Sequence, residues 1–411
     1  MLVLSAIAAP SAAESLTIAQ AIDEAVQHNL VLMAERSNLT IADAQMVTAR
    51  LRPNPVFSFS ADHLDVLGTG FSPSNNGGPP EIAWRVDVPL ERGGKREARI
   101  ALASAVRSAA EAQFADAVRV LKQDVTLACV DVIAAQAART LVADTLRTYD
   151  DLVRVNRARL AAGSIAPFEA TRSEVAMLQF RATVVRADLD LASATARLRT
   201  LLGRPPGAAL EIVDALSVAG GLAPDVGSLQ SAAMQARPDL RALELAQART
   251  TADLRLQEAL GRIDYTVGAE YRRQQGIAGR SNSLGVFVSA PLPLSNRNQG
   301  EIARAGAERE QVDRQIAARR AQVAADVQTA YHEYVTTREL VDSIERDLLR
   351  PATRARDTSA YTYKAGAATL LELLDAQRAF NETMQSYVDA QASLRRAMTR
   401  LNAAVGMEVL P

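Results

Sequence analysis

The feature that most constrains the fold of this chain is an internal duplication. Two segments of the 411-residue sequence carry the same landmark residues in the same order. A nearly constant offset of about two hundred residues over long segments indicates a duplication and not chance similarity. The fold must therefore use one structural unit twice. The matching pairs are Pro89 and Pro291, Lys95 and Arg297, Gly163 and Gly366, Glu169 and Glu372, and Gly203 and Gly406.

The repeat divides the chain into stretches. We assign residues 14–203 to the first copy, 204–228 to an irregular equatorial segment, 229–406 to the second copy and 407–411 to a tail. Residues 1–13 resemble the end of an export signal, because an apolar run precedes the small residues Ser11-Ala12-Ala13. The basic leader of such a signal is absent, so a disordered apolar tail is the alternative.

Composition excludes several classes of protein. Lys and Arg number 46 against 47 Asp and Glu, and no basic stripe indicates nucleic-acid binding. The single Cys129 excludes an internal disulfide framework and a cysteine-based metal cluster. No run of about eighteen apolar residues is evident, so we expect no transmembrane helix.

Each copy carries two segments in which apolar and polar residues alternate, which is typical of β-strands. We predict strands over about 55–65, 81–91, 264–274 and 283–292, joined as hairpins by loops rich in Gly, Pro, Asn and Ser. About ten residues is the length that a tilted strand needs to cross a bilayer. Amphipathic hairpins packed on a soluble core are the alternative. Long helices with partners of their own leave those apolar faces nothing to pack against.

Two very long helices follow the strands. Residues 95–162 contain neither proline nor glycine, and apolar residues recur there at the three-four spacing of a coiled-coil seam. Residues 301–364 repeat the pattern, with a kink expected at Pro351. At 1.5 Å per residue each spans roughly 100 Å, about twice the length of the other four predicted helices. Those cover about 17–50, 168–202, 229–260 and 369–405.

Stacking two short helices against one long helix gives a tall helical cylinder with four strands at one end. Four strands cannot close a barrel, and an open sheet edge cannot lie in lipid. The chain must therefore oligomerise, and three copies would supply twelve strands around a lumen. We predict a mainly α protein with a transmembrane β part, forming a conduit.

The chain resembles the TolC family of outer-membrane efflux proteins over nearly its whole length. Four segments in order carry the resemblance, and any one of them alone is weak. They are Pro53-Asn-Pro before the first strand, Pro89-Leu-Glu-Arg-Gly-Gly-Lys-Arg, Pro291-Leu-Pro-Leu-Ser-Asn-Arg-Asn-Gln-Gly, and Tyr363-Lys-Ala-Gly-Ala-Ala-Thr-Leu-Leu-Glu-Leu-Leu-Asp-Ala-Gln-Arg.

The resemblance implies a homotrimer in the outer membrane of a Gram-negative bacterium, with a twelve-stranded β-barrel continuous with a periplasmic α-helical barrel. It also implies a periplasmic adaptor (membrane fusion protein) and an inner-membrane pump of the RND type as partners. The segment beginning at Pro291 is most similar to the CzcC-like branch, which serves pumps for heavy-metal cations. Multidrug or type I secretion channels of the same fold are the alternative.

The same resemblance implies functional roles for residues at the end of the helices where the two Gly turns lie. Glu372 and Asp375 match positions that line a closed aperture in the family, although an acidic residue in a first helical turn also complements the helix dipole. Tyr363 matches a tyrosine that latches the aperture, whereas the latch arginine appears here as Ala368. Adaptor contact is expected around the two turns, at Leu160, Gly163, Ser164, Gly366 and Ala367.

Other candidates follow from the patterns themselves. Polar strand residues are expected to line the barrel lumen, namely Asp62, Arg85, Asp87, Glu270 and Arg272. His28, His63 and His332 lie on separate predicted elements, so we expect no metal site and no cofactor. Cys129 lies deep in a helix, where we expect a packing residue and not the lipid anchor that many relatives carry.

Three other classes remain as alternatives. A soluble coiled-coil scaffold would have the same helices. A periplasmic adaptor also has a long helical hairpin, but the doubled helix-strand-strand-helix frame disfavours it. An enzyme is disfavoured because no catalytic constellation is evident, and Arg92-Gly-Gly-Lys lacks the spacing of a P-loop.

Overall fold

The structure is a computed structural model, and it describes residues 14–64, 66–68, 70, 80–217, 224–276 and 279–410. The signal-like segment 1–13 and most of the first hairpin loop lie outside the described residues. The chain divides into two units. One holds residues 1–36, 113–240 and 319–411, and the other holds 37–112 and 241–318. Each unit therefore draws on both copies of the repeat.

The two copies of the repeat have the same order of elements. The first runs β1 (Glu14–Leu16), α1 (Ile18–His28), α2 (Leu30–Arg50), β2 (Val56–Asp62), β3 (Glu81–Leu90), α3 (Lys95–Ala161) and α4 (Pro167–Leu202). The second runs β4 (Leu210–Ile212), α5 (Val226–Ala236), α6 (Pro238–Leu260), β5 (Tyr265–Gly276), β6 (Gly279–Ser289), α7 (Gln299–Ser343), the π-helical turn η1 (Ile344–Leu348), α8 (Leu349–Lys364) and α9 (Leu370–Val405).

The helices expected over 17–50 and 229–260 are each broken, which corrects the prediction. The breaks fall at Asn29 and Arg237, whose ψ angles are both 120°. At Arg237 the cause is Pro238, which forces the preceding residue out of helical geometry. At Asn29 the side chain acts as a cap, because its Oδ1 accepts a hydrogen bond from the Leu32 N–H at 3.0 Å.

The two breaks are bound in equivalent ways to the ends of α4 and α9. Asn29 Nδ2 donates to the carbonyl oxygen of Leu201 at 2.9 Å, and Arg237 donates to that of Ala404 at 3.3 Å. Leu201 and Ala404 are matching positions of the repeat. The duplication therefore extends to the hydrogen bonds that anchor each break.

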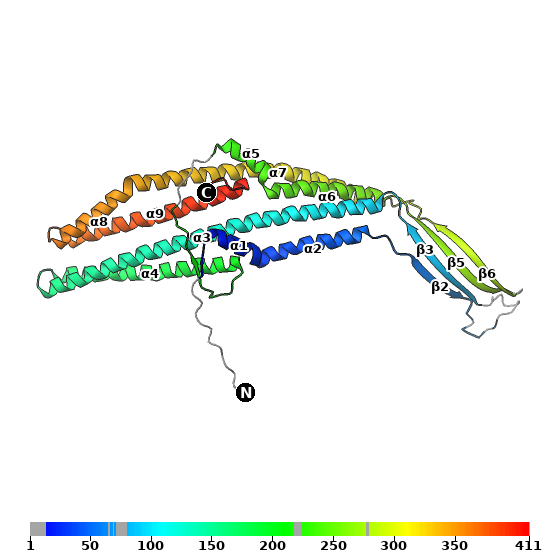
Figure 1. Ribbon diagram of the computed structural model, residues 1–411, viewed down its shortest axis with the longest axis horizontal. Coiled ribbons are helices and arrows are strands. Elements are labelled where there is room, and N and C mark those ends of the chain that lie inside the picture. The colour runs from blue at the N-terminus through cyan, green and yellow to red at the C-terminus, as the bar shows by residue number, and fades with distance from the viewer. Residues whose placement is uncertain are drawn as a thin grey trace, which may run out of the picture. The chain divides into compact units, whose positions relative to one another are not determined.

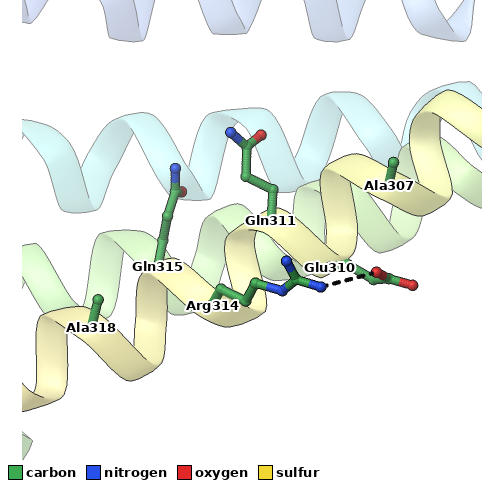
Figure 2. Close-up of a pocket in the computed structure, with 6 residues that line it drawn as sticks. All are labelled: Ala307, Glu310, Gln311, Arg314, Gln315 and Ala318. Carbon is green, nitrogen blue, oxygen red and sulfur yellow. Dashed lines mark ion pairs between the residues drawn. The ribbon is translucent and has the colours of Figure 1, made fainter.

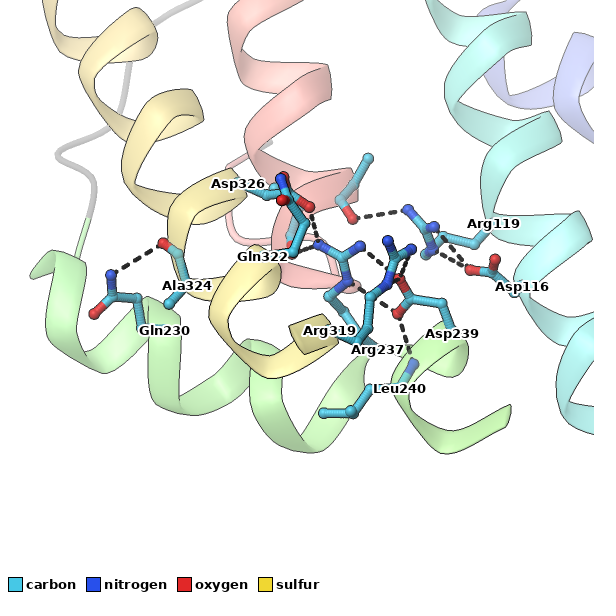
Figure 3. Close-up of polar contacts among 12 residues, drawn as sticks. Asp116, Arg119, Gln230, Arg237, Asp239, Leu240, Arg319, Gln322, Ala324 and Asp326 are labelled. Carbon is cyan, nitrogen blue, oxygen red and sulfur yellow. Dashed lines mark hydrogen bonds and ion pairs between the residues drawn. The ribbon is translucent and has the colours of Figure 1, made fainter. Parts of the chain in front are cut away.

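Around Arg237 these contacts grow into a buried ionic cluster (Figure 3). Arg237 donates to both carboxylate oxygens of Asp239 at 3.0 and 2.6 Å, and to Asp326 at 2.9 Å. Arg319 Nε also donates to Asp239, at 2.9 Å. Burial disfavours the charged carboxylate, but the two guanidinium groups outweigh it and hold the pKa of Asp239 at about 2. This cluster therefore links α6 to α7 within one unit.

The expected kink at Pro351 takes the form of the π-helical turn η1, one turn earlier. The N–H of Leu349 bonds to the carbonyl oxygen of Ile344, five residues back. Proline has no N–H, and its ring crowds the carbonyl four residues before it. Widening the preceding turn relieves that conflict, so the helix continues into α8 without a break.

Two apolar clusters form the core of the larger unit. One surrounds Val125 and Cys129 of α3 and includes Val388 and Ala392 of α9. The other joins α5, α7 and α9 around Tyr334. The short parallel pair of β1 with β4 was not predicted, and neither was the docking of the tail, where Leu410 is buried.

One 18-residue window of α3 has a mean hydropathy of 1.5, so by length and composition this helix could cross a membrane. The expectation of no such segment is corrected to that extent. Val125, Ala128, Cys129 and Val132 of α3 are buried in the first cluster, as in the core helix of a soluble region.

Candidate functional site

The four long strands form one antiparallel sheet in the order β2-β3-β5-β6, side by side in Figure 1. Residues paired across an antiparallel ladder share a face, and alternate residues point to opposite faces. The register pairs Asp62 with Glu81, Arg85 with Glu270, and Asp87 with Gly268. All five residues expected to line a lumen, Arg272 included, therefore lie on one face of this sheet.

Ion pairs connect the side chains of this polar face. Arg85 lies 2.9 Å from Asp87 within β3, and Arg272 lies 3.0 Å from Glu270 within β5. Arg272 also reaches Glu81 of β3 at 2.9 Å. The charged groups cover one another, and Glu270 is only 9% exposed. These ion pairs offset the charges of β3 and β5 on this face.

The opposite face is apolar and uncovered. Leu284 and Val286 of β6 are 84% and 80% exposed. At the centre the Trp84 ring stacks on Tyr271 at 5.6 Å and meets Phe59 at 5.9 Å. An exposed apolar surface of this extent marks contact with a membrane or another protein. Its other exposed members are Phe57, Val86, Val88, Leu90, Val267 and Val288.

The sheet has two open edges within the described residues, because β2 and β6 each pair with one strand only. Each edge carries a row of backbone donors and acceptors available to another strand. A chain that places this sheet in lipid must cover both edges.

The two Gly turns between long and short helices share their hydrogen bonds. Ser164 N–H donates to the carbonyl oxygen of Arg159 at 2.8 Å, and the matching Ala367 donates to that of Thr362 at 2.9 Å. This is the Schellman pattern, which needs a residue with positive φ. Gly163 and Gly366 supply it with φ of 71° and 77°. Leu160, half-buried, ends the α3 side of the first turn.

Tyr363 is buried between α8 and α3. Its hydroxyl donates to Asn156 Oδ1 at 2.6 Å, and the Arg159 guanidinium lies 5.1 Å from the centre of its ring. Arg159 also donates to the carbonyl oxygen of Lys364 at 2.9 Å, so an arginine of α3 takes part although Ala368 holds the expected arginine position. Sequence reasoning missed Asn156, a polar residue three positions after Val153 on the apolar seam.

This bond lies beside a hollow of about 310 Å³ between α3, α8 and α9. Tyr149, Leu152 and Leu373 are among the residues that line it, together with Tyr363. Asn156 Nδ2 is buried without a hydrogen-bond partner among the described residues. An unmade hydrogen bond of a buried amide is costly, so the helix contacts here are less tightly satisfied than in the core.

The two acidic candidates differ in what they bind. Glu372 forms a capping box with Thr369, in which Glu372 Oε2 accepts the Thr369 N–H at 2.8 Å. Asp375 is exposed and makes no recorded hydrogen bond or ion pair among the described residues. The capping role of Glu372 was readable from the Thr-x-x-Glu pattern.

Helix α4 carries a second apolar stripe that no described residue covers. Val175, Leu178, Val185 and Leu189 are 50%, 54%, 66% and 68% exposed. Their spacing of three, seven and four is that of a coiled-coil seam. The matching positions of Val185 and Leu189 on α9 are Val388 and Ala392, which are buried in the core. Only the copy on α4 is left open.

A shallow depression follows α7 in the smaller unit (Figure 2). All six residues lining it come from this one helix, with Ala307 and Ala318 at its ends and Glu310 paired with Arg314. A hollow formed by a single helix encloses no ligand. Its small residues permit close approach by another helix.

The histidines lie on or beside three elements, with His28 at the end of α1, His63 after β2 and His332 in α7. The described part of the chain holds no group of three His, Cys, Asp or Glu side chains placed to bind a metal ion.

Comparison with known proteins finds one family profile, "Outer membrane efflux protein", matching residues 21–204 and 229–407. The two matches coincide with the two copies of the repeat. The cobalt-zinc-cadmium resistance protein CzcC of Cupriavidus metallidurans is 25% identical over 408 residues, which cover 96% of this chain and 91% of CzcC.

Solved structures share the fold. The outer-membrane channel OprN superposes with a TM-score of 0.76 at 20% identity, over 95% of this chain and 89% of that one. The CmeC outer membrane channel of Campylobacter jejuni gives 0.79 at 12% identity, over 95% and 85%.

Proposed function

We propose that this chain, which belongs to the outer membrane efflux protein family, forms a homotrimeric channel that conducts its substrate passively out of the cell. Membership of the family makes it an outer-membrane protein, and the family resemblance predicted from the sequence is confirmed. The proposal concerns its assembly, its gate, its partners and its substrate.

The two-faced sheet with open edges is the observation that carries the proposal. The apolar face suits lipid, and the ion-paired face suits water. Pairing β6 of one copy with β2 of the next removes every open edge when the ring closes. Three copies give twelve strands, enough to leave a lumen lined by Asp62, Arg85, Asp87, Glu270 and Arg272.

The stripe on α4 supports the same assembly. A second copy is the occupant that would cover it, because Val388 and Ala392, the α9 residues that match Val185 and Leu189, are buried in a cluster with α3 of their own chain. Each copy would then use α4 to continue the ring of helices that its own α3 and α9 begin. The contact is head-to-tail, as a closed ring requires.

The Gly-turn end is proposed as gate and docking tip. The Tyr363–Asn156 bond ties α8 to α3 and would hold the aperture closed, while Asp375 supplies a free carboxylate to its rim. Glu372 contributes charge there but is also a cap. The exposed turns at Gly163, Ser164, Gly366 and Ala367 would meet a periplasmic adaptor joined to an inner-membrane pump of the RND type.

Divalent heavy-metal cations are the proposed substrate, because of the similarity to CzcC along nearly the whole chain. A multidrug or type I secretion channel of this fold is the second candidate, and the shared fold with OprN and CmeC does not distinguish them. A deletion strain separates the two. Sensitivity confined to Zn, Co and Cd supports metal efflux, and sensitivity confined to drugs contradicts it.

Conduction itself is tested with the purified chain in planar bilayers. We expect ion current without nucleotide. Asp375→Asn should lower the preference for cations, and Asp342→Asn, an exposed acid of α7, is the control. Glu372 is left intact because its loss would also remove the cap. Absence of current would contradict the proposed channel. Unchanged selectivity in Asp375→Asn would contradict the proposed place of Asp375 at the gate.

A further inference from the structure

A cluster of arginines lies where the sheet joins the helices. Strands β2 and β5 begin there and β3 and β6 end there, and the register pairs Leu90 with Tyr265 at this end of the sheet. Helices α2 and α6 end at the same junction, and α3 and α7 begin there (Figure 1). We define the arginine collar as Arg50, Arg52, Arg92, Arg96, Arg262 and Arg297.

Backbone contacts bring the members of the collar together. Arg96 Nε donates to the carbonyl oxygen of Arg50 at 2.8 Å. A Cβ atom on Gly93 would lie 2.5 Å from Cδ of Arg262, so the Arg262 side chain crosses the backbone next to Arg92. Gly93 has φ of 75°, which also favours glycine. A Cβ atom on Gly261 would lie 2.8 Å from the carbonyl oxygen of Arg297, so this arginine begins beside Arg262. These contacts bring arginine-bearing segments from several parts of the chain together at the junction.

The collar is not neutralised within the described residues. The junction holds two further cations, Lys95 and Arg99, and these bind its carboxylates Asp264 and Glu91 at 2.7 and 2.9 Å. Glu97, Glu258 and Glu301 are further acids at the helix ends, and Glu301 pairs with Arg304. None of the six collar arginines forms an ion pair within the described residues. This concentration of positive charge contrasts with a net charge of −1 for the whole chain.

The collar is continuous with the apolar face of the sheet. Tyr265 pairs with Leu90 and belongs to that face. The Arg92 guanidinium lies 4.8 Å from the centre of the Tyr265 ring and donates to its hydroxyl at 2.7 Å. Leu292 and Leu294, just before Arg297, are 79% and 83% exposed. Apolar residues, an aromatic ring and arginines follow one another as at a membrane boundary.

We propose that the arginine collar binds the phosphate groups of anionic phospholipids in the leaflet on the helix side of the membrane. The inference rests on the proposed insertion of the sheet into lipid. Guanidinium groups bind phosphate oxygens in pairs of parallel hydrogen bonds, and basic residues beside a membrane span attract anionic headgroups. The collar thereby fixes the depth of the sheet and favours phosphatidylglycerol or cardiolipin around the channel.

The single tryptophan of the chain provides the test. Trp84 lies on the apolar face, so lipids with brominated acyl chains quench its fluorescence when they contact the sheet. The full-length protein is reconstituted in two series of vesicles that contain phosphatidylcholine and rising fractions of phosphatidylglycerol. In the first series the phosphatidylglycerol is brominated, and in the second the phosphatidylcholine is brominated. We expect a severalfold preference for phosphatidylglycerol at low salt that falls as salt is raised, because salt screens the attraction between the arginines and the anionic headgroups.

The variant R92Q/R262Q/R297Q should lose the preference. The matched control R249Q/R255Q/R309Q removes three exposed arginines of α6 and α7, also without recorded ion pairs, and should keep it. Quenching of the wild type by neither brominated lipid would contradict the proposed insertion. Equal quenching by both lipids would contradict the collar alone, as would a preference that survives in the triple variant. If that variant does not insert, the wild type is tested alone: a preference for phosphatidylglycerol that does not fall with salt would contradict binding by the collar.

Discussion

At the scale of single residues, burial decides which side chains are reactive and which are structural. Cys129 is completely buried, and burial raises the pKa of its thiol to about 12. Tyr363 is also buried, but its hydroxyl is bound to a partner on another helix. The first residue belongs to the core, and the second joins α8 to α3 through its hydrogen bond.

We predict that Cys129 resists maleimide at pH 8 in the folded protein. A pKa of about 12 in place of 9.0 leaves roughly a thousandfold less thiolate than an ordinary cysteine. The measurement is the labelling rate, with Ser164→Cys at the exposed turn in a Cys129→Ser background as the control. Equal rates for the two cysteines would show that the α3 core opens readily.

Tyr363→Phe should raise the open probability of the channel in planar bilayers, because it removes the hydroxyl that donates to Asn156 Oδ1. The loss of stability should be about 1–2 kcal/mol. Tyr361→Phe is the matched control, since Tyr361 is 75% exposed and its hydroxyl makes no hydrogen bond within the described residues. Equal effects of the two substitutions would remove Tyr363 from the gate.

At the scale of elements, two glycines at helix ends have different surroundings. A Cβ atom on Gly203, which ends α4 with φ of 72°, would lie 2.4 Å from the carbonyl oxygen of His28. Gly163 has the same φ sign, but its Cβ would meet nothing within 4 Å. A side chain at either position would strain the backbone, but only a side chain at position 203 would also clash with a neighbouring segment.

Gly203→Ala should destabilise the protein more than Gly163→Ala does. Both substitutions cost about 1 kcal/mol for the left-handed backbone, and only the first adds a clash with the α1 backbone. Thermal unfolding of the two variants measures the difference. Equal melting temperatures would mean that α1 and α4 are not held together as described.

Asp239 stabilises the α6–α7 contact in a manner that depends on pH. Its pKa of about 2 lies below the ordinary 3.8, so its contribution is complete above about pH 4 and is lost as the pH falls toward 2. Asp239→Asn should lower the stability at pH 7 by about 3–5 kcal/mol, because Arg237 remains buried. The difference from the wild type should shrink in acid.

Asp151→Asn is the control for this titration, because the Asp151–Arg154 pair is largely exposed and should contribute under 1 kcal/mol. A pH-independent difference between wild type and Asp239→Asn would contradict the assigned role of the carboxylate.

Periodicity predicted the elements that depend on local pattern, and missed those set by contacts distant in sequence. Alternation located the strands, and Tyr363 was reached through the resemblance to a family. The break at Asn29 was missed because it depends on Leu201, far along the chain. Asn156, the partner of Tyr363, lies at the end of a seam that is mostly apolar in the sequence. The collar arginines are ordinary surface residues until the junction brings their segments together.

At the scale of the whole molecule, a single chain leaves several surfaces uncovered. The sheet edges, the apolar sheet face and the α4 stripe all need a partner or lipid. A scaffold protein would have no use for a sheet with one ion-paired and one apolar face. Copies of this chain can cover the edges and the stripe together, and lipid can cover the face.

Leu178→Lys with Val185→Lys should prevent stable trimers, because two charges would enter the seam that a second copy buries. Gln179→Lys with Thr183→Lys adds the same charge to exposed positions of α4 outside the stripe, and should leave assembly intact. Sedimentation in detergent distinguishes the outcomes. Normal trimers of the first variant would assign the α4 stripe to another partner.

The most direct test of the central claim is the protein mass of the purified complex in detergent, after correction for bound detergent. We expect three copies of the 44.0 kDa chain, because only a closed ring covers both edges of every sheet. A monomer or an open-ended series of larger species would contradict the trimeric channel, since the edges of β2 and β6 would remain exposed.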